Sequence, residues 1–191
     1  MDIDSVGLER ALDALGQLLA DRQHHHEVVA IGGGSLLLLG QINRPTKDLD
    51  LVALVANQEL ISADPLPLSL LEAAEEVANA LNLGKNWLNP GPTSLLGAGL
   101  PQGFSTRMHT RHYGGLTIHL AGRLDQICLK LYASADQGPD SKHFADLKSL
   151  QPTQSELQIA ARWCITQDVS KPFAEELESA VNAFGLNHAD S

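Results

Sequence analysis

The chain has 191 residues, which is long enough to bury a sizeable core in one compact domain with a helical extension. With 23 Asp and Glu against 13 Lys and Arg, its net charge of -10 argues against indiscriminate binding to nucleic acid or to an anionic membrane, although a local basic groove is compatible with it. No apolar run approaches the roughly 20 residues of a transmembrane helix, and the N-terminus does not resemble a signal peptide. We therefore expect a cytoplasmic protein with no membrane partner.

The first half of the chain predicts strands between helices. Leucines at three- and four-residue spacing over residues 5–22 indicate an amphipathic helix, and residues 27–31 are typical of a buried strand that ends at three glycines. A short helix is expected over 35–39. A second strand is expected over 48–55, where acidic and apolar residues alternate before the segment becomes wholly apolar. Residues 69–83 have a Ser cap and a following glycine, which predicts a helix with defined ends.

The second half changes from strands to helices. Residues 89–103 are rich in Pro and Gly and predict a long surface loop. Strands are expected over 105–113 and 116–121, joined as a hairpin by Gly114 and Gly115. The helices expected after this hairpin cover 124–135, 141–150, 153–167 and 172–184.

These elements divide the chain into two parts. An α/β core with an N-terminal helix is expected over residues 1–122, and a C-terminal helical region over 123–191 is expected to pack on that core. The two cysteines, Cys128 and Cys164, lie in apolar helical patterns far apart in the sequence. This placement predicts core thiols rather than a disulfide or a CxxC metal site.

An acidic pair begins the second expected strand. Because side chains on a strand alternate between faces, Asp48 and Asp50 point the same way and Leu49 points oppositely. Two adjacent carboxylates repel each other unless a cation or solvent relieves them, and hard oxygen ligands favour Mg²⁺, which keeps waters and substrate phosphates in its shell. The alternative interpretation is a pair of solvated carboxylates at a strand end.

A glycine-rich turn precedes the acidic pair. Residues 32–35 (GGGS) lie between the first strand and the short helix, where free backbone N–H groups can cradle phosphate. The turn is not a Walker loop, because no Lys-Ser/Thr follows the glycines, and it lacks the GxGxxG spacing of dinucleotide sites. A phosphate cradle and a cation site would then share one nucleoside triphosphate.

The turn and the acidic pair together resemble the nucleotidyltransferase superfamily. Its signature is a Gly-Gly/Ser turn followed by an acidic pair, here Gly33, Gly34 and Ser35 with Asp48 and Asp50. The resemblance implies an α/β (α+β) fold, with a mixed sheet flanked by helices and a C-terminal helical part.

Three further segments are similar to the AbiEii toxin-like, minimal nucleotidyltransferase-like branch, which includes toxins of bacterial toxin–antitoxin systems. Residues 44–50 (RPTKDLD) have its R-x-T/S-x-D-x-D form. Residues 129–133 (LKLYA) and 142–147 (KHFADL) resemble its helical Lys motif and its following K-D-x-x-D-L motif. The resemblance spans residues 28–150.

This resemblance implies transfer of a nucleoside monophosphate from a triphosphate, with Mg²⁺ (or Mn²⁺), to an RNA end, a protein hydroxyl or a small molecule, and it implies a possible antitoxin partner. Asp48 and Asp50 would be catalytic and hold the metal. Lys130 would bind phosphate charge, and Asp146 would support Lys130 or act as a base. The residues implied to contact the nucleotide are Gly33, Gly34, Ser35, Arg44 and Thr46.

Several of these residues also have plainer explanations. Lys130 could snorkel from an apolar helix, and Asp146 could be a surface residue. Arg44 could cap the loop before Pro45, and Thr46 could be a turn residue.

The chain departs from the branch pattern in two respects. His143 stands where the branch often has Asp, and the basic residue usually seen near Asp140 or Ser141 is missing. His119 stands where many nucleotidyltransferases supply a third carboxylate, although the branch relies instead on its later Lys and Asp. The change at His143 and the acidic pI permit an alternative function, a catalytically impaired nucleotide-binding or toxin–antitoxin interaction protein. A third alternative is a generic α/β protein whose acidic pair is a surface feature.

One basic stripe stands out in the second half. Arg107, His109 and Arg111 alternate along the strand expected over 105–113 and would share one face of it. This face could receive a nucleotide or an RNA backbone, or it could be solvated.

Overall fold

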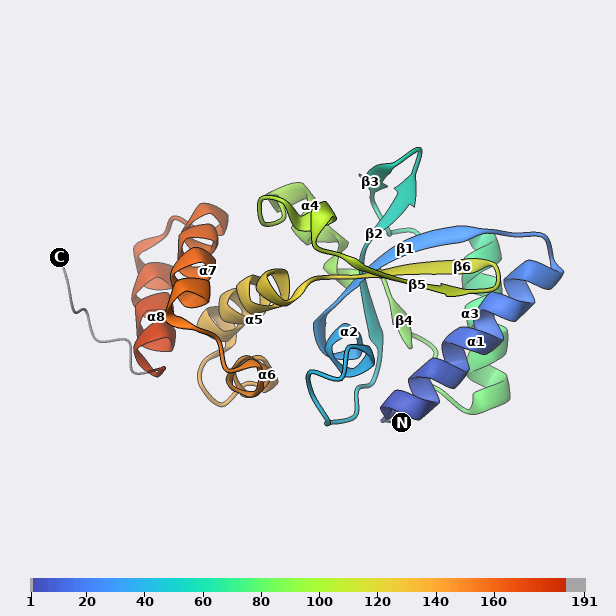
Figure 1. Ribbon diagram of the computed structural model, residues 1–191, viewed down its shortest axis with the longest axis horizontal. Helices are drawn as coiled ribbons and strands as arrows, with labels where there is room; N and C mark the ends of the chain where they lie inside the picture. Colours follow the sequence, from blue (N-terminus) through green and yellow to red (C-terminus); the bar gives the residue numbers. More distant parts are fainter. Residues whose placement is uncertain (1, 185–191) are drawn as a thin grey trace. The chain divides into compact units, whose positions relative to one another are not determined.

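The computed structural model describes residues 2–184, which form two compact units (Figure 1). Residues 2–100 and 104–121 make up the α/β unit, and residues 101–103 and 122–184 make up the helical unit. The predicted fold class is confirmed, because the described residues contain a mixed six-stranded sheet, flanking helices and further helices toward the C-terminus.

The sheet lies wholly in the α/β unit, with the strand order β3-β2-β1-β6-β5 and with β4 paired to β2. Strand β1 is antiparallel to β2 and parallel to β6, while β2–β3 and β5–β6 are antiparallel hairpins. The strands are β1 (His26–Ile31), β2 (Leu49–Ala56), β3 (Glu59–Ile61), β4 (Leu88–Asn89), β5 (His109–Tyr113) and β6 (Leu116–Leu120). The Gly114–Gly115 hairpin is confirmed, whereas the short strands β3 and β4 were not predicted.

The pairing of β1 with β2 fixes where the acidic pair lies. A register shift between Val29 and Ala30 of β1 interrupts the ladder, and beyond it Ala30 pairs with Leu51 and Ile31 with Asp50. Ile31 is also the N-cap of the next helix. The chain therefore leaves β1 and starts a helix directly beside the acidic end of β2.

Helices α1 and α3 enclose the apolar core of the α/β unit together with the sheet. Helix α1 packs on β5 and β6 and against α3, and four of its five leucines, Leu8, Leu12, Leu15 and Leu19, are fully buried. Figure 1 shows α1 and α3 side by side. The helices are α1 (Ser5–Asp21), α2 (Gly32–Leu38), α3 (Leu68–Leu81) and α4 (Ser94–Ala98), with 3-10 turns at Gly91–Thr93 and Phe104–Thr106.

The expected ends of the third helix were wrong. Pro67, not Ser69, occupies the N-cap of α3, because the Ser69 hydroxyl lies 2.8 Å from His26 Nε2 on β1 instead. At the other end, Asn82 adopts a left-handed conformation with φ 54 and ends the helix before Gly84.

The segment expected as a loop over 89–103 also differs. It contains the Gly91–Thr93 turn and α4, both of which pack on β2. These short elements depend on contacts with the sheet, which the Pro- and Gly-rich composition does not reveal.

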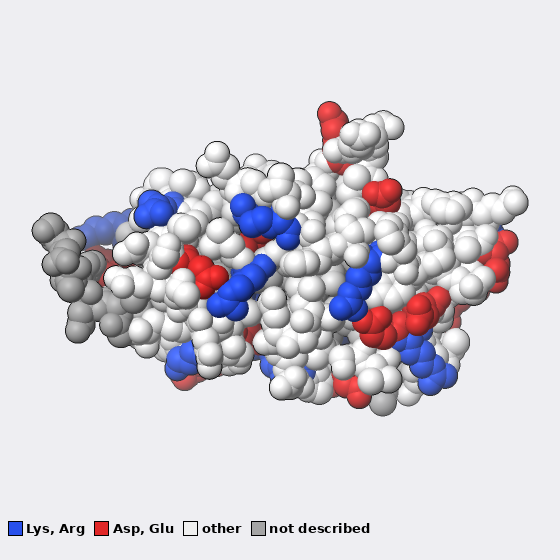
Figure 2. All heavy atoms as spheres, in the orientation of Figure 1, with Lys and Arg blue, Asp and Glu red and all other residues white. Residues whose placement is uncertain are grey.

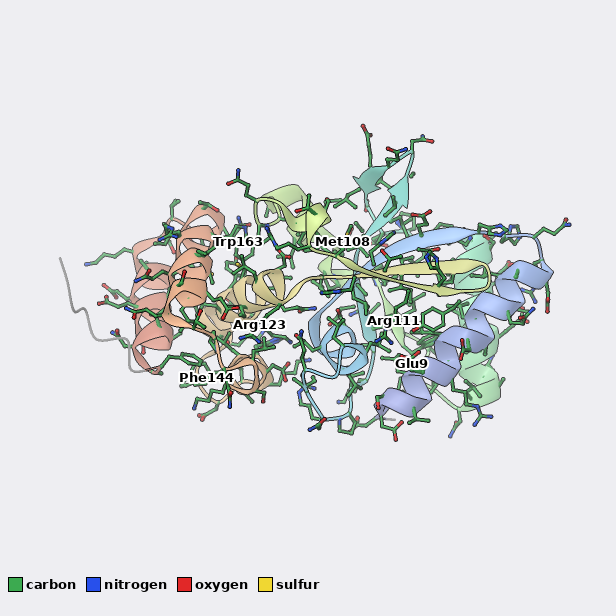
Figure 3. All side chains as sticks on the ribbon, in the orientation of Figure 1. Glu9, Met108, Arg111, Arg123, Phe144 and Trp163 are labelled. Atoms are coloured by element: carbon green, nitrogen blue, oxygen red, sulfur yellow. The ribbon has the colours of Figure 1, made fainter. Side chains whose placement is uncertain are left out.

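The expected basic stripe does not form. Strand β5 begins at His109, so Arg107 lies outside it. Arg111 instead forms an ion pair with Glu9 of α1 and donates to the Leu38 carbonyl at 2.7 Å (Figure 3). The Tyr113 hydroxyl donates to Glu9 at 2.7 Å, and burial together with this bond raises the Tyr113 pKa to about 12. On the face in Figure 2, basic side chains are scattered among acidic ones.

The helical unit confirms the expected helices, which are α5 (Arg123–Gln137), α6 (Lys142–Leu150), α7 (Gln154–Gln167) and α8 (Lys171–Asn182). Helix α5 packs against the other three. Thr153 and Glu156 form a capping box at the start of α7. Cys128 and Cys164 are both buried, as predicted, and burial raises the pKa of the Cys164 thiol. No helix in the described range 2–184 is both long and apolar enough to cross a membrane.

The contact of α1 with the β5–β6 turn gives a first prediction. A Cβ on Gly16 would lie 1.7 Å from the Tyr113 carbonyl oxygen, which is backbone and cannot move cheaply. Gly16→Ala should therefore cause overpacking and lower the free energy of unfolding, measured by urea titration, by about 1–3 kcal/mol.

Gly97→Ala is the matched control, because Gly97 is an exposed position of α4 with open space around it. An exposed helical Gly→Ala change should leave stability unchanged or raise it by about 1 kcal/mol. Equal effects of the two variants would contradict the packing described for Gly16.

Candidate functional site

The first turn of α2 lies directly against the beginning of β2. A Cβ on Gly32 would lie 2.6 Å from Asp50 Oδ2, and a Cβ on Gly34 would lie 2.8 Å from the Asp48 carbonyl oxygen. Gly32 also has a φ of +74, which favours glycine. The glycines were expected as a turn before a helix at 35–39, but α2 begins at Gly32 because their missing side chains admit this approach.

The carboxylate of Asp50 lies between Asn89 and the beginning of α2. Its Oδ1 accepts a hydrogen bond from Asn89 Nδ2 at 2.9 Å, and its Oδ2 is the atom nearest to the Cβ position of Gly32. Asn89 is paired with Asp50 in the β2–β4 ladder and accepts from the Gly91 N–H at 3.0 Å through its own Oδ1. Asn89 therefore fixes the orientation of the carboxylate, with Oδ2 on the side of α2.

The sequence did not predict a role for Asn89 in the candidate site. It lies in a two-residue strand within the segment expected as a loop, and its role depends on pairing with a strand far away in the chain. Nothing in its immediate sequence points to Asp50.

Asp48 lies just before β2 and is partly exposed. The Thr46 hydroxyl donates to the Asp48 carbonyl oxygen at 3.0 Å, and the backbone of Thr46 pairs with that of Ile3. Thr46 is itself 6% exposed. The segment that leads into the acidic pair is therefore anchored on the N-terminal residues of the same unit.

Arg44 lies beside the first turn of α2. A Cβ on Gly33 would lie 3.0 Å from Arg44 Nη2 and 3.5 Å from Thr46 Oγ1, and Arg44 Nη1 donates to the Pro45 carbonyl at 3.2 Å. The guanidinium group thus approaches the same turn as the acidic pair. A positive group, a helix start and two carboxylates can together bind a phosphate and its cation.

Ser35 is less accessible than the sequence suggested. It is the fourth residue of α2 and is 0% exposed, and Gly33 and Gly34 are also buried. The contact of these three residues with phosphate stays a prediction.

Lys130 and Asp146 pair within the helical unit. Lys130 Nζ of α5 lies 2.7 Å from Asp146 Oδ2 of α6, with side chains that are 4% and 1% exposed. Neither a snorkelling lysine nor a surface aspartate fits this burial. Their proposed roles toward phosphate stay predictions.

His119 is held by neighbouring polar groups. Its Nδ1 lies 2.9 Å from Thr110 Oγ1, and its Nε2 lies 3.2 Å from Glu27 Oε2. His119 of β6 therefore contacts Thr110 of β5 and Glu27 of β1.

The acidic pair fits a metal ion that arrives with its substrate. Within residues 2–184, no group of three or more His, Cys, Asp or Glu side chains is placed to hold a metal. Mg²⁺, however, is commonly held by one or two carboxylates, with waters and substrate phosphates completing its shell. Asp48 and Asp50 match this donor set, and they would hold the ion together with a bound triphosphate.

The comparisons with known proteins give one match. A family model described as "Nucleotidyltransferase of unknown function (DUF6036)" matches residues 8–142. The comparisons with curated proteins and with solved structures found no match. The matched range contains the α2 turn, the acidic pair, Asn89 and Lys130, and it ends before Asp146.

The buried Lys130–Asp146 pair gives a second prediction. Lys130→Met leaves the Asp146 carboxylate without its 2.7 Å partner in a buried position, which should lower the free energy of unfolding by about 3–5 kcal/mol. The double variant Lys130→Met with Asp146→Leu should regain part of this loss, measured by chemical denaturation. Lys171→Met is the control, because the exposed Lys171–Glu175 pair should contribute little. A single variant as stable as the wild type would contradict the described pairing.

Proposed function

The chain belongs to the DUF6036 family of nucleotidyltransferases, and from this premise we propose that it transfers a nucleoside monophosphate from a triphosphate to a hydroxyl group in an Mg²⁺-dependent reaction. The observation that carries the proposal is the contact between the α2 turn and the acidic pair. It brings a helix start, which attracts phosphate, next to the carboxylate of Asp50, which attracts a cation, and next to the backbone of Asp48.

The proposed site assigns one task to each neighbouring group. The backbone of the α2 turn and Arg44 bind the phosphate oxygens. Asp48 and Asp50 hold Mg²⁺ (or Mn²⁺), with Asp50 oriented by Asn89. When bound, the ion supplies charge neutralisation for the triphosphate and the leaving group. Gly33, Gly34, Ser35 and Thr46 support the phosphate-binding turn.

The transfer itself is an in-line substitution. The acceptor oxygen bonds to the α-phosphorus, the bond from this phosphorus to the bridging oxygen breaks, and pyrophosphate leaves with that electron pair. The hydroxyl proton passes to a base or to solvent. The protein contributes mainly positioning and electrostatic stabilisation.

Lys130 and Asp146 are proposed to serve the same reaction, with Lys130 toward phosphate charge and Asp146 as its support or as the base. This assignment rests on the resemblance of the segments that contain them. The packing of the region 123–191 on the core 1–122 is likewise a prediction from the sequence.

The finer assignments are also proposals. We place the chain in the AbiEii toxin-like branch on the strength of residues 44–50 and the downstream Lys and Asp motifs. This placement suggests a cytoplasmic toxin–antitoxin component with an antitoxin partner. An RNA end, a protein hydroxyl and a small molecule are the candidate acceptors.

A second candidate function is nucleotide binding without turnover, in a protein that acts through a partner such as an antitoxin. It is supported by the acidic pI and by the resemblance, in which His143 stands where the AbiEii branch often has Asp. Calorimetry with triphosphate and Mg²⁺ separates the candidates when it is combined with a transfer assay. Binding without transfer supports the second candidate, and no Mg²⁺-linked binding contradicts both.

The transfer assay gives the third prediction. Purified protein is incubated with each radiolabelled triphosphate, Mg²⁺ and either total RNA or cell lysate. Asp48→Ala should lower label incorporation at least about a hundredfold, because losing a metal ligand removes several kcal/mol of transition-state stabilisation.

Asp13→Ala is the control for this assay, since Asp13 is an exposed aspartate on α1 of the same unit. It should incorporate label as the wild type does. Incorporation by Asp48→Ala at the wild-type level would show that the acidic pair does not catalyse transfer.

A further inference from the structure

A cavity of about 490 Å³ opens in the α/β unit near the edge of the sheet formed by β4. Its walls come from the segment after β3, the outer side of α3, and β4 with the turn that follows it. This volume is within the range of about 300–1,000 Å³ typical of small-molecule sites. No residue expected from the sequence to bind nucleotide lies in it.

The cavity adjoins the acidic pair through one residue. Asn89 is part of the cavity wall and also donates to Asp50 Oδ1 at 2.9 Å. The two neighbours of Asn89 in the chain, Leu88 and Pro90, line the cavity as well. Asn89 is therefore shared between the wall of the cavity and the hydrogen bond that holds the Asp50 carboxylate.

The lining matches an uncharged, flat group better than a phosphate. Pro65, Leu66 and Leu71 contribute apolar surface, and the amides of Asn86 and Asn89 offer both donors and acceptors. A nucleobase has apolar faces, which can pack on such apolar side chains, and a polar edge, which can form hydrogen bonds with such amides.

The charged residues of the lining also disfavour a phosphate. The lining contains two carboxylates, Asp64 and Glu75, and one cationic side chain, Lys85. Carboxylates repel phosphates, so the triphosphate tail and a polyanionic acceptor such as RNA are disfavoured here. The phosphates belong at the α2 turn beside Arg44, on the other side of Asp50.

We propose that this cavity binds the nucleoside part of the triphosphate, with Asn89 between the base and the metal-binding carboxylate. This inference rests on the proposed function, because it requires the phosphates to lie at the acidic pair. It assigns the selection of the nucleotide to the loop after β3, α3 and β4.

Calorimetry with two kinds of probe tests the proposal. ATP, GTP, CTP and UTP carry a nucleoside, whereas inorganic tripolyphosphate has only the phosphate chain, and all are titrated with Mg²⁺. The wild type should bind at least one nucleotide about tenfold more tightly than tripolyphosphate, since the nucleoside buries apolar surface.

Leu71→Trp places an indole in the cavity from a position that is 40% exposed. It should abolish this nucleotide preference and leave tripolyphosphate affinity unchanged.

Leu68→Trp is the matched control, because Leu68 is on the same helix, is 68% exposed and does not line the cavity. It should change neither affinity. Unchanged tripolyphosphate binding by Leu71→Trp also shows that this variant is folded.

The outcomes separate the two proposals. Equal affinity of the wild type for nucleotides and tripolyphosphate, or an intact nucleotide preference in Leu71→Trp, would overturn the cavity assignment while the phosphate and metal site stands. Absence of any Mg²⁺-linked binding of tripolyphosphate or nucleotides to the wild type would overturn the proposed function and the cavity assignment with it.

Discussion

The close approach of the α2 backbone to the carboxylate of Asp50 is the constraint on which the candidate site depends. Side chains at Gly32 or Gly34 would collide with Asp50 Oδ2 or with the Asp48 backbone, so glycine is required where the helix begins. The register of β1 and β2 produces this approach, because Ile31 both pairs with Asp50 and caps α2. Strand pairing thus places a helix start, which carries partial positive charge, against the negative carboxylate of Asp50.

The surrounding contacts make this arrangement rigid. Asn89 holds Asp50 through β4, Thr46 fixes the segment before Asp48, and Arg111 joins β5 to α1 and α2. A site that binds a phosphate and a cation benefits from such preorganisation, since its groups then need little rearrangement when charge develops in the reaction. Within the helical unit, the buried Lys130–Asp146 pair is a second polar feature among apolar helices, and its burial makes each partner dependent on the other.

Local patterns in the sequence predicted much of the fold, and long-range contacts explain most of the differences. The apolar run of β2, the leucine spacing of α1 and the helices after Gly122 are properties of neighbouring residues, and the structure contains these elements. By contrast, β4 exists only through its pairing with β2, and Asn89 gains its contact with Asp50 in the same way. A contact between residues far apart in the sequence also explains the beginning of α3. The Ser69 hydroxyl, which was expected to cap this helix, lies at hydrogen-bonding distance from His26 of β1. The candidate site was therefore predictable in its charged and glycine residues but not in the groups that orient them.

We propose that the acidic pair and the α2 turn bind a metal and a triphosphate together. A crystal structure with Mn²⁺ and a triphosphate that cannot be cleaved between its α- and β-phosphates tests this proposal, because anomalous scattering locates the ion. We expect an anomalous peak within bonding distance of carboxylate oxygens of Asp48 and Asp50 and of the triphosphate, with phosphate oxygens at the α2 turn. A triphosphate bound elsewhere, or an ion that contacts neither aspartate, would contradict it.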